Sequence, residues 1–176
     1  MPRPSLKNSL VLSISPSTRG FGFAVLEDHE TLVDWGVKSI RRDKNTLPLK
    51  KAQELILLYK PGLLVLEDYF IGNSRRSQRI RELSHAMETL AQGHSITVVT
   101  FSREQVRRVF FADNQGTKHA LAEILAARFP DELSFHLPPK RRLWTSEDHR
   151  MAIFEAVALA LTSILKKRRT PAKGRP

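Results

Sequence analysis

Short runs of hydrophobic residues, separated by turn-forming residues, dominate the first part of the chain. Residues 10–15 form a β-prone apolar run that breaks at Pro16. Two further apolar runs occupy residues 21–26 and 31–37, with the polar stretch 27–30 between them. Because consecutive strands joined by short turns usually pair with one another, this order predicts an antiparallel meander of three strands.

The hydrophobic period then changes to that of helices alternating with strands. Residues 47–59 carry apolar side chains at helical spacing and are followed by a Pro-Gly pair, which predicts a helix with a defined end. Residues 63–67 are apolar up to an acidic end, as in a strand buried on both faces. A helix that closes at Gly93 and a strand at residues 96–101 complete a strand, helix, strand unit, which favours parallel pairing.

The second half of the chain is predicted to be mainly helical. Ser102 and Gln105 have the spacing of a capping box at the start of one helix, and residues 118–129 form another. Thr145 and Asp148 offer a similar box for a long last helix. The whole pattern predicts an α/β fold with a mixed five-stranded sheet, in which a three-stranded meander is followed by parallel strands and helices flank the sheet.

The length and composition predict one globular domain. The chain has 176 residues, of which 41% are hydrophobic, enough for one ordinary core. We expect this domain to span residues 9–165, after an N-terminal segment at 1–8. Residues 166–176 are rich in Lys, Arg, Pro and Gly and are expected to form a disordered basic tail.

Net charge is the strongest compositional signal. The 29 Lys and Arg residues exceed the 18 Asp and Glu residues, which gives a charge of +11 and a pI near 10.4. Such a protein is expected to bind nucleic acid, because each neutralised phosphate releases counterions. A charged surface that is simply solvated is the alternative.

Cysteine content and hydrophobicity limit the cellular setting. The chain has no cysteine, which excludes disulfides and thiolate metal sites and suits a reducing cytoplasm, where we expect the protein. The longest apolar stretch, residues 151–165, is interrupted by Glu155 and is shorter than the roughly 18 residues of a membrane span. The N-terminus lacks a secretory hydrophobic region. No membrane association is therefore expected.

Three short motifs, taken in order, resemble those of the RuvC junction resolvases. Residues 14–17, Ile-Ser-Pro-Ser, stand where that family has an Ile-Asp-Pro-Gly turn after its first strand. Residues 66–70, Leu-Glu-Asp-Tyr-Phe, fit the run in which the family's next acidic residue closes a strand. Residues 154–160, Phe-Glu-Ala-Val-Ala-Leu-Ala, are similar to its final Asp-bearing, alanine-rich helix. The resemblance covers residues 9–165 and implies a ribonuclease H-like fold.

The resemblance also implies a catalytic centre that binds divalent metal. Such nucleases cluster carboxylates around two Mg²⁺ ions, about 4 Å apart, at one phosphodiester. It implies Glu67 and Glu155 as ligands of Mg²⁺ or Mn²⁺, with Asp148 and His149 as less certain ones. Asp148 precedes Glu155 by about 10 Å of helical rise, too far for both to reach one ion easily. The alternatives are a solvated strand end for Glu67, a basic partner or the wet stripe of a helix for Glu155, a helix cap for Asp148 and a surface histidine for His149.

Ser15 takes the place of the family's first aspartate. A neutral hydroxyl on so short a side chain cannot supply the negative charge that bridges two cations. Asp68 is a poor substitute, because adjacent residues of a strand point to opposite faces. Catalysis is therefore expected to be weakened or lost, unless the Pro16 turn, Glu67 and Glu155 keep a weaker or one-metal site.

The resemblance further implies a nucleic-acid interface and a homodimer. Phe70 would stack on a base at the junction, Lys118 would lie near the scissile phosphate at a helix N-terminus, and the following helix would help form the dimer. Core packing is the alternative for Phe70. The other residues predicted to contact nucleic acid are Arg19, Arg75, Arg76 and Arg79.

These features favour a Mg²⁺-dependent, structure-selective endonuclease that acts on branched DNA, such as Holliday junctions, in recombination and repair. A catalytically inactive nucleic-acid-binding protein of the same fold is the second hypothesis, favoured by Ser15. An RNA-processing nuclease of the YqgF-like group is the third, and nothing in the sequence separates RNA from DNA. An actin-like ATPase would need a longer chain and a second phosphate loop, which are missing.

Overall fold

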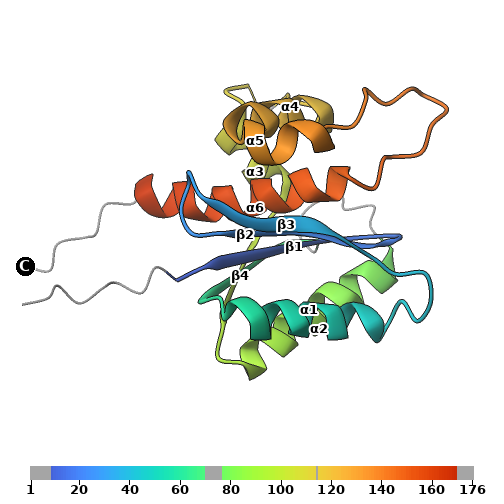
Figure 1. The fold of residues 1–176 in the computed structure, drawn as a ribbon, viewed down its shortest axis with the longest axis vertical. Helices are drawn as coiled ribbons and strands as arrows, with labels where there is room; N and C mark the ends of the chain where they lie inside the picture. The colour runs from blue at the N-terminus through green and yellow to red at the C-terminus, as the bar shows by residue number, and fades with distance from the viewer. Residues whose placement is uncertain (1–8, 70–76, 114, 170–176) are drawn as a thin grey trace, which may run out of the picture.

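The computed structural model describes residues 9–69, 77–113 and 115–169, which fold around one five-stranded sheet (Figure 1). The strands are β1 (Val11–Ser17), β2 (Gly20–Leu26), β3 (Leu32–Ser39), β4 (Leu63–Glu67) and β5 (Thr97–Phe101). Their order in the sheet is β3-β2-β1-β4-β5. The first three pair antiparallel, and β4 lies parallel to both β1 and β5. This arrangement confirms the predicted mixed sheet.

Helices cover both faces of the sheet. They are α1 (Leu47–Tyr59), α2 (Gln78–Gly93), α3 (Arg103–Phe110), α4 (Lys118–Arg128), α5 (Pro130–Leu133) and α6 (Met151–Arg169), with a 3-10 turn η1 (Ser134–His136). In Figure 1, α1 and α2 lie below the sheet, whereas α6 crosses its upper face with α3, α4 and α5 outside it. None of the described helices has the length and apolar character needed to cross a membrane.

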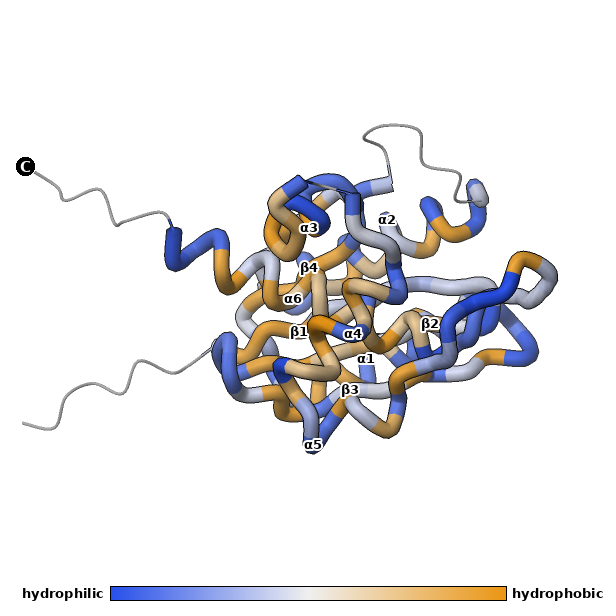
Figure 2. The backbone as a smooth tube through the Cα atoms, turned by 90° about the horizontal axis from the view of Figure 1, so that it is seen from above, coloured by the Kyte–Doolittle hydropathy of each residue, from blue (hydrophilic) through white to orange (hydrophobic). Residues whose placement is uncertain are grey.

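The sheet separates two hydrophobic cores, because successive side chains of a strand point to opposite faces. Leu12 and Ile14 of β1 belong to the core under α1 and α2. Val11 belongs to the core under α6, and Ser13 donates a 2.5 Å hydrogen bond to the Ala156 carbonyl of that helix. The apolar segments of α6 and of the central strands, orange in Figure 2, run through the middle of the molecule. Ser15, two residues after Ser13, therefore also faces α6.

Small residues let α6 lie very close to the sheet. Gly22 on β2 pairs with Ser15 on β1, and a Cβ atom at Gly22 would fall 2.2 Å from the Ala152 carbonyl oxygen. The helix presents alanines to this surface, among them Ala152 and Ala156. This contact fixes the height of α6 above the strand that carries Ser15.

The two ends of α6 differ from the prediction. The helix begins at Met151, whose N–H donates to the Asp148 carbonyl. Thr145 does not cap it, because its hydroxyl donates to the Arg142 carbonyl and closes a separate turn. At the other end, α6 continues over residues 166–169, which we had predicted as part of the disordered tail. Basic side chains are favourable at a helix C-terminus, and Lys166 also lies 5.0 Å from the centre of the Phe101 ring.

Of two other helix ends predicted from local sequence, one agrees fully with the structure and one in part. The capping box is confirmed at α3, where Ser102 Oγ accepts the Gln105 N–H at 3.2 Å and the Gln105 side chain accepts the Ser102 N–H at 2.8 Å. Pro130 follows α4 but starts the short helix α5, since proline is well suited to the first helical position.

Candidate active site and nucleic-acid interface

Ser15 and Glu67 lie side by side at the carboxyl ends of two parallel strands. The register pairs Ile14 of β1 with Leu66 of β4, so the next residue of each strand is Ser15 or Glu67. Both side chains face α6, because they follow residues that point to the opposite core. The sheet thus places two of the three predicted positions together.

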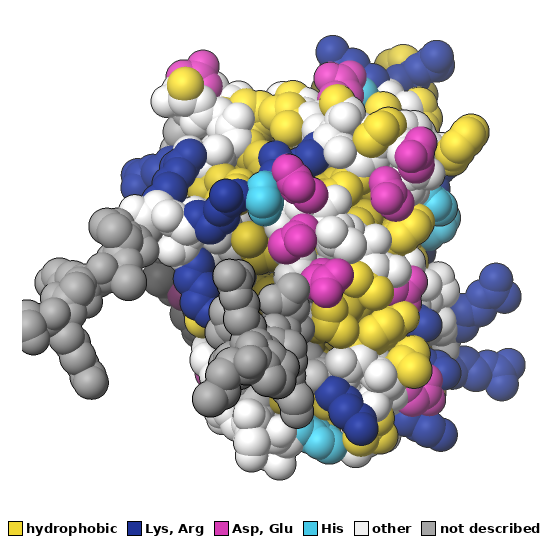
Figure 3. Space-filling model, turned by 60° about the vertical axis from the view of Figure 1, so that its left-hand side comes forward, with side chains coloured by type: hydrophobic (Ala, Val, Ile, Leu, Met, Phe, Trp, Pro, Cys, Tyr) yellow, Lys and Arg dark blue, Asp and Glu magenta, His cyan; other side chains and the backbone are white. Residues whose placement is uncertain are grey.

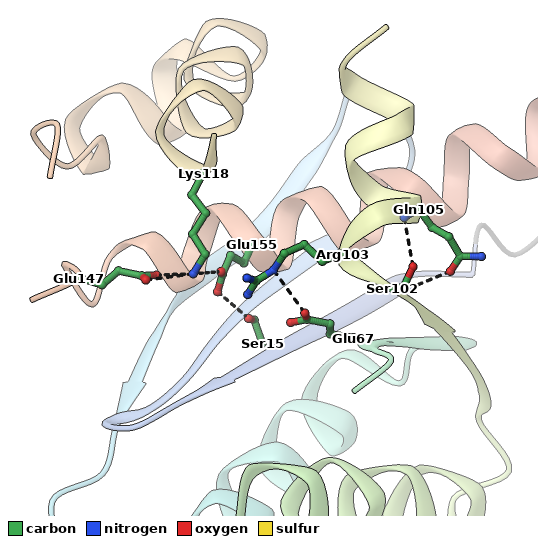
Figure 4. A network of polar contacts seen from close by, with 8 residues as sticks. All are labelled: Ser15, Glu67, Ser102, Arg103, Gln105, Lys118, Glu147 and Glu155. Atoms are coloured by element: carbon green, nitrogen blue, oxygen red, sulfur yellow. Dashed lines mark hydrogen bonds and ion pairs between the residues drawn. The ribbon is translucent and has the colours of Figure 1, made fainter. Parts of the chain in front are cut away.

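Glu155 descends from α6 onto this pair (Figure 4). The buried Ser15 hydroxyl donates a 3.1 Å hydrogen bond to Glu155 Oε2. The Glu155 side chain is only 17% exposed and that of Glu67 is 13% exposed. Three residues that are far apart in sequence therefore lie together at one partly buried position.

Lys118 neutralises the carboxylate of Glu155. Its Nζ lies 2.8 Å from Glu155 Oε1, and it also contacts both Glu147 oxygens, at 2.9 and 3.0 Å. Lys118 is the first residue of α4, whose N-cap Thr117 accepts the Ala120 N–H. The helix start therefore holds the ammonium group between two carboxylates.

A second cation stands beside Glu67. Arg103 Nε lies 3.7 Å from Glu67 Oε1, and Arg103 is the first residue of α3, directly after β5. Because β5 is the parallel neighbour of β4, the start of α3 necessarily lies near the end of β4. Glu67 and Glu155, two of the carboxylates predicted to bind metal, thus each have a protein cation next to them.

Arg103 and Glu147 were not predicted from the sequence. The strand order would have indicated Arg103, had the pairing of β4 with β5 been followed to the residues beyond the strand ends. No spacing rule points to Glu147, which contacts Lys118 across 29 residues. Its position depends on the path of the loop before α6.

The charged groups surround a pocket with an apolar lining. Glu67, Arg103, Lys118 and Glu155 contribute to its wall. Its other lining residues are Val106, Arg107, Phe111, Thr117, Leu121, Ala158 and Leu159. An apolar environment lowers the local dielectric and so strengthens the attraction between the paired charges.

This set of side chains does not fit the two-Mg²⁺ centre that the resemblance implied. Hard divalent cations need several anionic or carbonyl oxygens, whereas Ser15 is neutral and donates a hydrogen bond to Glu155. Lys118 already contacts the other oxygen of Glu155. Within residues 9–69, 77–113 and 115–169, no three Asp, Glu, His or Cys side chains form a group that could hold a metal. The chemistry of the site is that of a partly buried ion-pair network.

Asp148 lies three residues before α6 and pairs with Arg150. Its carboxylate accepts the backbone N–H of Arg150 at 2.9 Å and contacts the guanidinium Nη2 at 2.7 Å. His149 Nδ1 lies 3.7 Å from the same carboxylate. The bond from the Arg150 side chain lowers the pKa of Asp148 from 3.8 to about 2. Of the acids before α6, Glu147 is the one that reaches Lys118, while a metal-binding role for Asp148 stays a prediction.

We expect Asp148→Asn to remove an acid-sensitive part of the stability. The folded pKa of Asp148 is below its ordinary value, so its pairing stabilises the fold above about pH 4 and is lost as the pH falls towards 2. Because the two side chains are 28% and 35% exposed, the variant should be less stable by only about 1 kcal/mol at pH 7. Urea unfolding between pH 2 and 7 measures this difference.

Arg150→Gln is the partner variant for that test. It should cause a similar loss at pH 7, and the double variant should lose less than the sum, because both changes break one ion pair. A difference between wild type and Asp148→Asn that does not change with pH would contradict the assignment.

The predicted nucleic-acid contacts are spread over the molecule. Phe70, Arg75 and Arg76 lie outside the described residues. Arg79 belongs to the first turn of α2, on the face of the sheet opposite to α6, and Arg19 is exposed in the turn between β1 and β2. On the face in Figure 3, basic side chains occur in several groups interleaved with acidic and hydrophobic ones. These assignments stay predictions.

Comparison with known proteins identifies the fold. No protein-family model matches the sequence, and no curated protein is similar enough in sequence to count as a match. RuvC from Thermus thermophilus is a structural neighbour with a TM-score of 0.66 and 14% identity, covering 91% of this chain and 96% of RuvC. The same RuvC in complex with a Holliday junction substrate gives 0.60 and 17%, covering 92% and 96%.

A eukaryotic protein shows the same likeness. The yeast mitochondrial Holliday junction resolvase superposes with a TM-score of 0.56 and 14% identity, covering 92% of this chain and 82% of the resolvase. The matches therefore extend over nearly the whole length of the chain. Together with the strand order and the position of Ser15, Glu67 and Glu155, they show that this chain has the ribonuclease H-like fold of the RuvC-type resolvases.

Proposed function

We propose that this chain binds branched DNA and does not hydrolyse it. The observation that carries the proposal is the ion-pair network, in which Lys118 holds Glu155 and Arg103 stands beside Glu67. Hydrolysis in this fold depends on carboxylates that hold divalent metal. A network in which protein cations neutralise those carboxylates supports DNA binding without cleavage.

The energetics favour the protein cations over a metal ion. A divalent ion at Glu155 would have to displace the Lys118 ammonium and break the hydrogen bond from Ser15. It would gain no new anion in exchange, because Ser15 carries no charge. The ion would then depend on Glu155 and Glu67 as its anionic ligands, fewer oxygens than a hard divalent cation usually takes.

Charge and fold support DNA as the partner. The chain has a net charge of +11, and a RuvC structure of the same fold was determined with a Holliday junction. Such a charge stabilises complexes with nucleic acid by counterion release. We further propose that the protein acts as a homodimer, so that two copies contact the arms of one junction.

A metal-dependent nuclease is the second candidate. One observation favours it: Ser15, Glu67 and Glu155 converge at the carboxyl ends of the central parallel strands. Lys118 also has a second carboxylate partner, Glu147, so it could leave Glu155 and stay paired. This candidate predicts cleavage that requires Mg²⁺ or Mn²⁺ and depends on Glu67.

Binding and cleavage assays separate the two candidates. The full chain would be incubated with a labelled four-way junction, a linear duplex of the same sequence and an RNA hairpin, in EDTA, Mg²⁺ or Mn²⁺. We expect the junction to be bound most tightly in all three buffers and to remain intact. Binding should also weaken steeply with salt, because it rests on phosphate contacts.

Variants exclude contaminating nucleases from that assay. Glu67→Ala should not change cleavage if the protein is inactive, and Glu54→Ala, on the exposed side of α1, is the matched control. Metal-dependent cutting that Glu67→Ala abolishes and Glu54→Ala preserves would overturn the proposal in favour of a nuclease. Tighter binding to the hairpin than to the junction would overturn DNA as the partner.

A further inference from the structure

The connection between η1 and α6 carries the most exposed hydrophobic pair of the described chain at its tip. We refer to residues 137–150 as the 137–150 loop. Within it, Leu143 is 99% exposed and Trp144 is 78% exposed. The loop projects at the upper right of Figure 1, and its blue stretch leads to an orange tip at the right-hand edge of Figure 2. Large apolar side chains held this far from the core are unfavourable in water unless a partner covers them.

The tip is a defined turn. The Thr145 N–H donates to the Arg142 carbonyl at 3.1 Å, which closes a four-residue β-turn with Leu143 and Trp144 as its central residues. The Thr145 hydroxyl reinforces the turn with a 3.0 Å bond to the same carbonyl, and Arg141 Nε donates to the Thr145 carbonyl at 2.8 Å. The chain therefore holds the two apolar side chains outward.

Cations surround the tip. Lys140, Arg141 and Arg142 precede the apolar pair directly, and the Arg142 guanidinium lies 5.9 Å from the centre of the Trp144 ring. Together with Arg19, these residues line one surface pocket beside the turn between β1 and β2. An indole with guanidinium groups around it matches a nucleobase surrounded by phosphates.

The loop is attached to the candidate site at both of its ends. Near its start, the Pro138 carbonyl lies 3.1 Å from His119 Nε2 on α4. Near its end, Glu147 holds Lys118, the residue before His119. Both ends of the loop are therefore anchored at the start of α4, where Lys118 and His119 lie.

We propose that Trp144 stacks as a wedge on the open face of a base pair where the arms of branched DNA separate. This inference rests on the proposed function and adds the residue that distinguishes a branch from a continuous duplex. Away from its ends, a continuous duplex offers no exposed base-pair face, because each internal pair is stacked on both sides. Proteins that open or kink DNA insert apolar side chains at such steps, and flanking cations hold the phosphates. Trp144 thus contributes preference for branches, and Lys140 to Arg142 contribute general affinity.

Binding by matched variants tests the wedge. Trp144→Ala, Trp144→Phe and Phe135→Ala would be compared with wild type on a four-way junction and a linear duplex. Phe135 is the control, because it is an 89% exposed aromatic with no Lys or Arg within four residues. We expect Trp144→Ala to weaken junction binding about ten-fold, as for loss of one stacked base, and duplex binding by less than about two-fold. Trp144→Phe should keep most of the preference for the junction over the duplex. Phe135→Ala should change neither junction binding nor duplex binding.

A fluorescent base at the branch point tests where Trp144 binds. The fluorescence of 2-aminopurine at this position should be quenched by wild type but not by Trp144→Ala. Equal losses on junction and duplex, or none, would overturn the wedge while leaving the proposed function intact. A wild type without junction preference would overturn both. Loss of binding to anionic phospholipid vesicles by Trp144→Ala, with junction binding unchanged, would assign the tip to a membrane surface instead and would also overturn the wedge.

Discussion

Replacing Gly22 with alanine is expected to lower the free energy of unfolding by about 3 kcal/mol, at the upper end of overpacking effects. A Cβ atom there would lie 2.2 Å from the Ala152 carbonyl oxygen and 2.7 Å from the Ala152 Cβ, so the backbone of α6 has to move. Such a loss corresponds to a fall in Tm of roughly 6 to 12 °C for a chain of this size. Urea unfolding and thermal melts measure it.

Gly93→Ala is the matched control for that substitution. Gly93 ends α2, and a Cβ atom there would meet nothing within 4 Å. Because alanine loses less backbone entropy than glycine on folding, this variant should be as stable as wild type or more stable, by up to about 1 kcal/mol. Equal stability of Gly22→Ala and wild type would show that α6 does not rest on β2 as described.

A second large effect is expected from Ser15→Asp in the absence of metal. Ser15 is fully buried and its hydroxyl lies 3.1 Å from Glu155, so the new carboxylate would stand against an existing one. Lys118 is already paired with the Glu155 carboxylate, at 2.8 Å. We expect a loss of about 3 kcal/mol in EDTA, typical of an uncompensated buried charge.

Metal should reverse this loss, because the variant has the additional anion that the natural chain lacks. Mn²⁺ at 100 times its dissociation constant would return about 2.7 kcal/mol of stability. Melting curves in EDTA and in increasing Mn²⁺ measure both quantities. The wild type is expected to show no comparable dependence on Mn²⁺.

Ser15→Asn is the control of matched size and no charge. It should lose far less stability than Ser15→Asp and gain none from Mn²⁺. If Ser15→Asp is as stable as wild type in EDTA, the ion-pair network can absorb a further negative charge, and our description of its charge balance is wrong. If the wild type gains as much stability from Mn²⁺ as the variant, the carboxylates bind metal without an aspartate at position 15.

Elements governed by local sequence were predictable. The helix at residues 47–59 and the strand at 63–67 were predicted with the bounds that the structure shows, since their apolar periods and end signals lie within the segments themselves. The start of α6 was not, because the hydroxyl of Thr145 closes a turn with Arg142 instead of capping the helix. A threonine hydroxyl can either cap a helix or close a turn, and the local sequence does not decide between the two roles.

The candidate site was predictable only in part. The convergence of Ser15, Glu67 and Glu155 followed from the order of three motifs in a resembling family. The ion pairs around them did not follow from the motifs. Arg103 lies near Glu67 because β4 pairs with β5, and Glu147 lies near Lys118 because of the path of the 137–150 loop. Such contacts depend on tertiary arrangement, which hydrophobic periodicity does not describe.

The position of Lys118 has a consequence for how the protein would respond to its surroundings. A metal ion at a catalytic centre is in exchange with the solution, so its occupancy follows the free concentration and falls when a chelator is added. The ammonium group of Lys118 is covalently attached to α4, and no dilution or chelator removes it from Glu155. The charge balance of the site would therefore not depend on the supply of divalent ions, and the protein would release its DNA by dissociation alone.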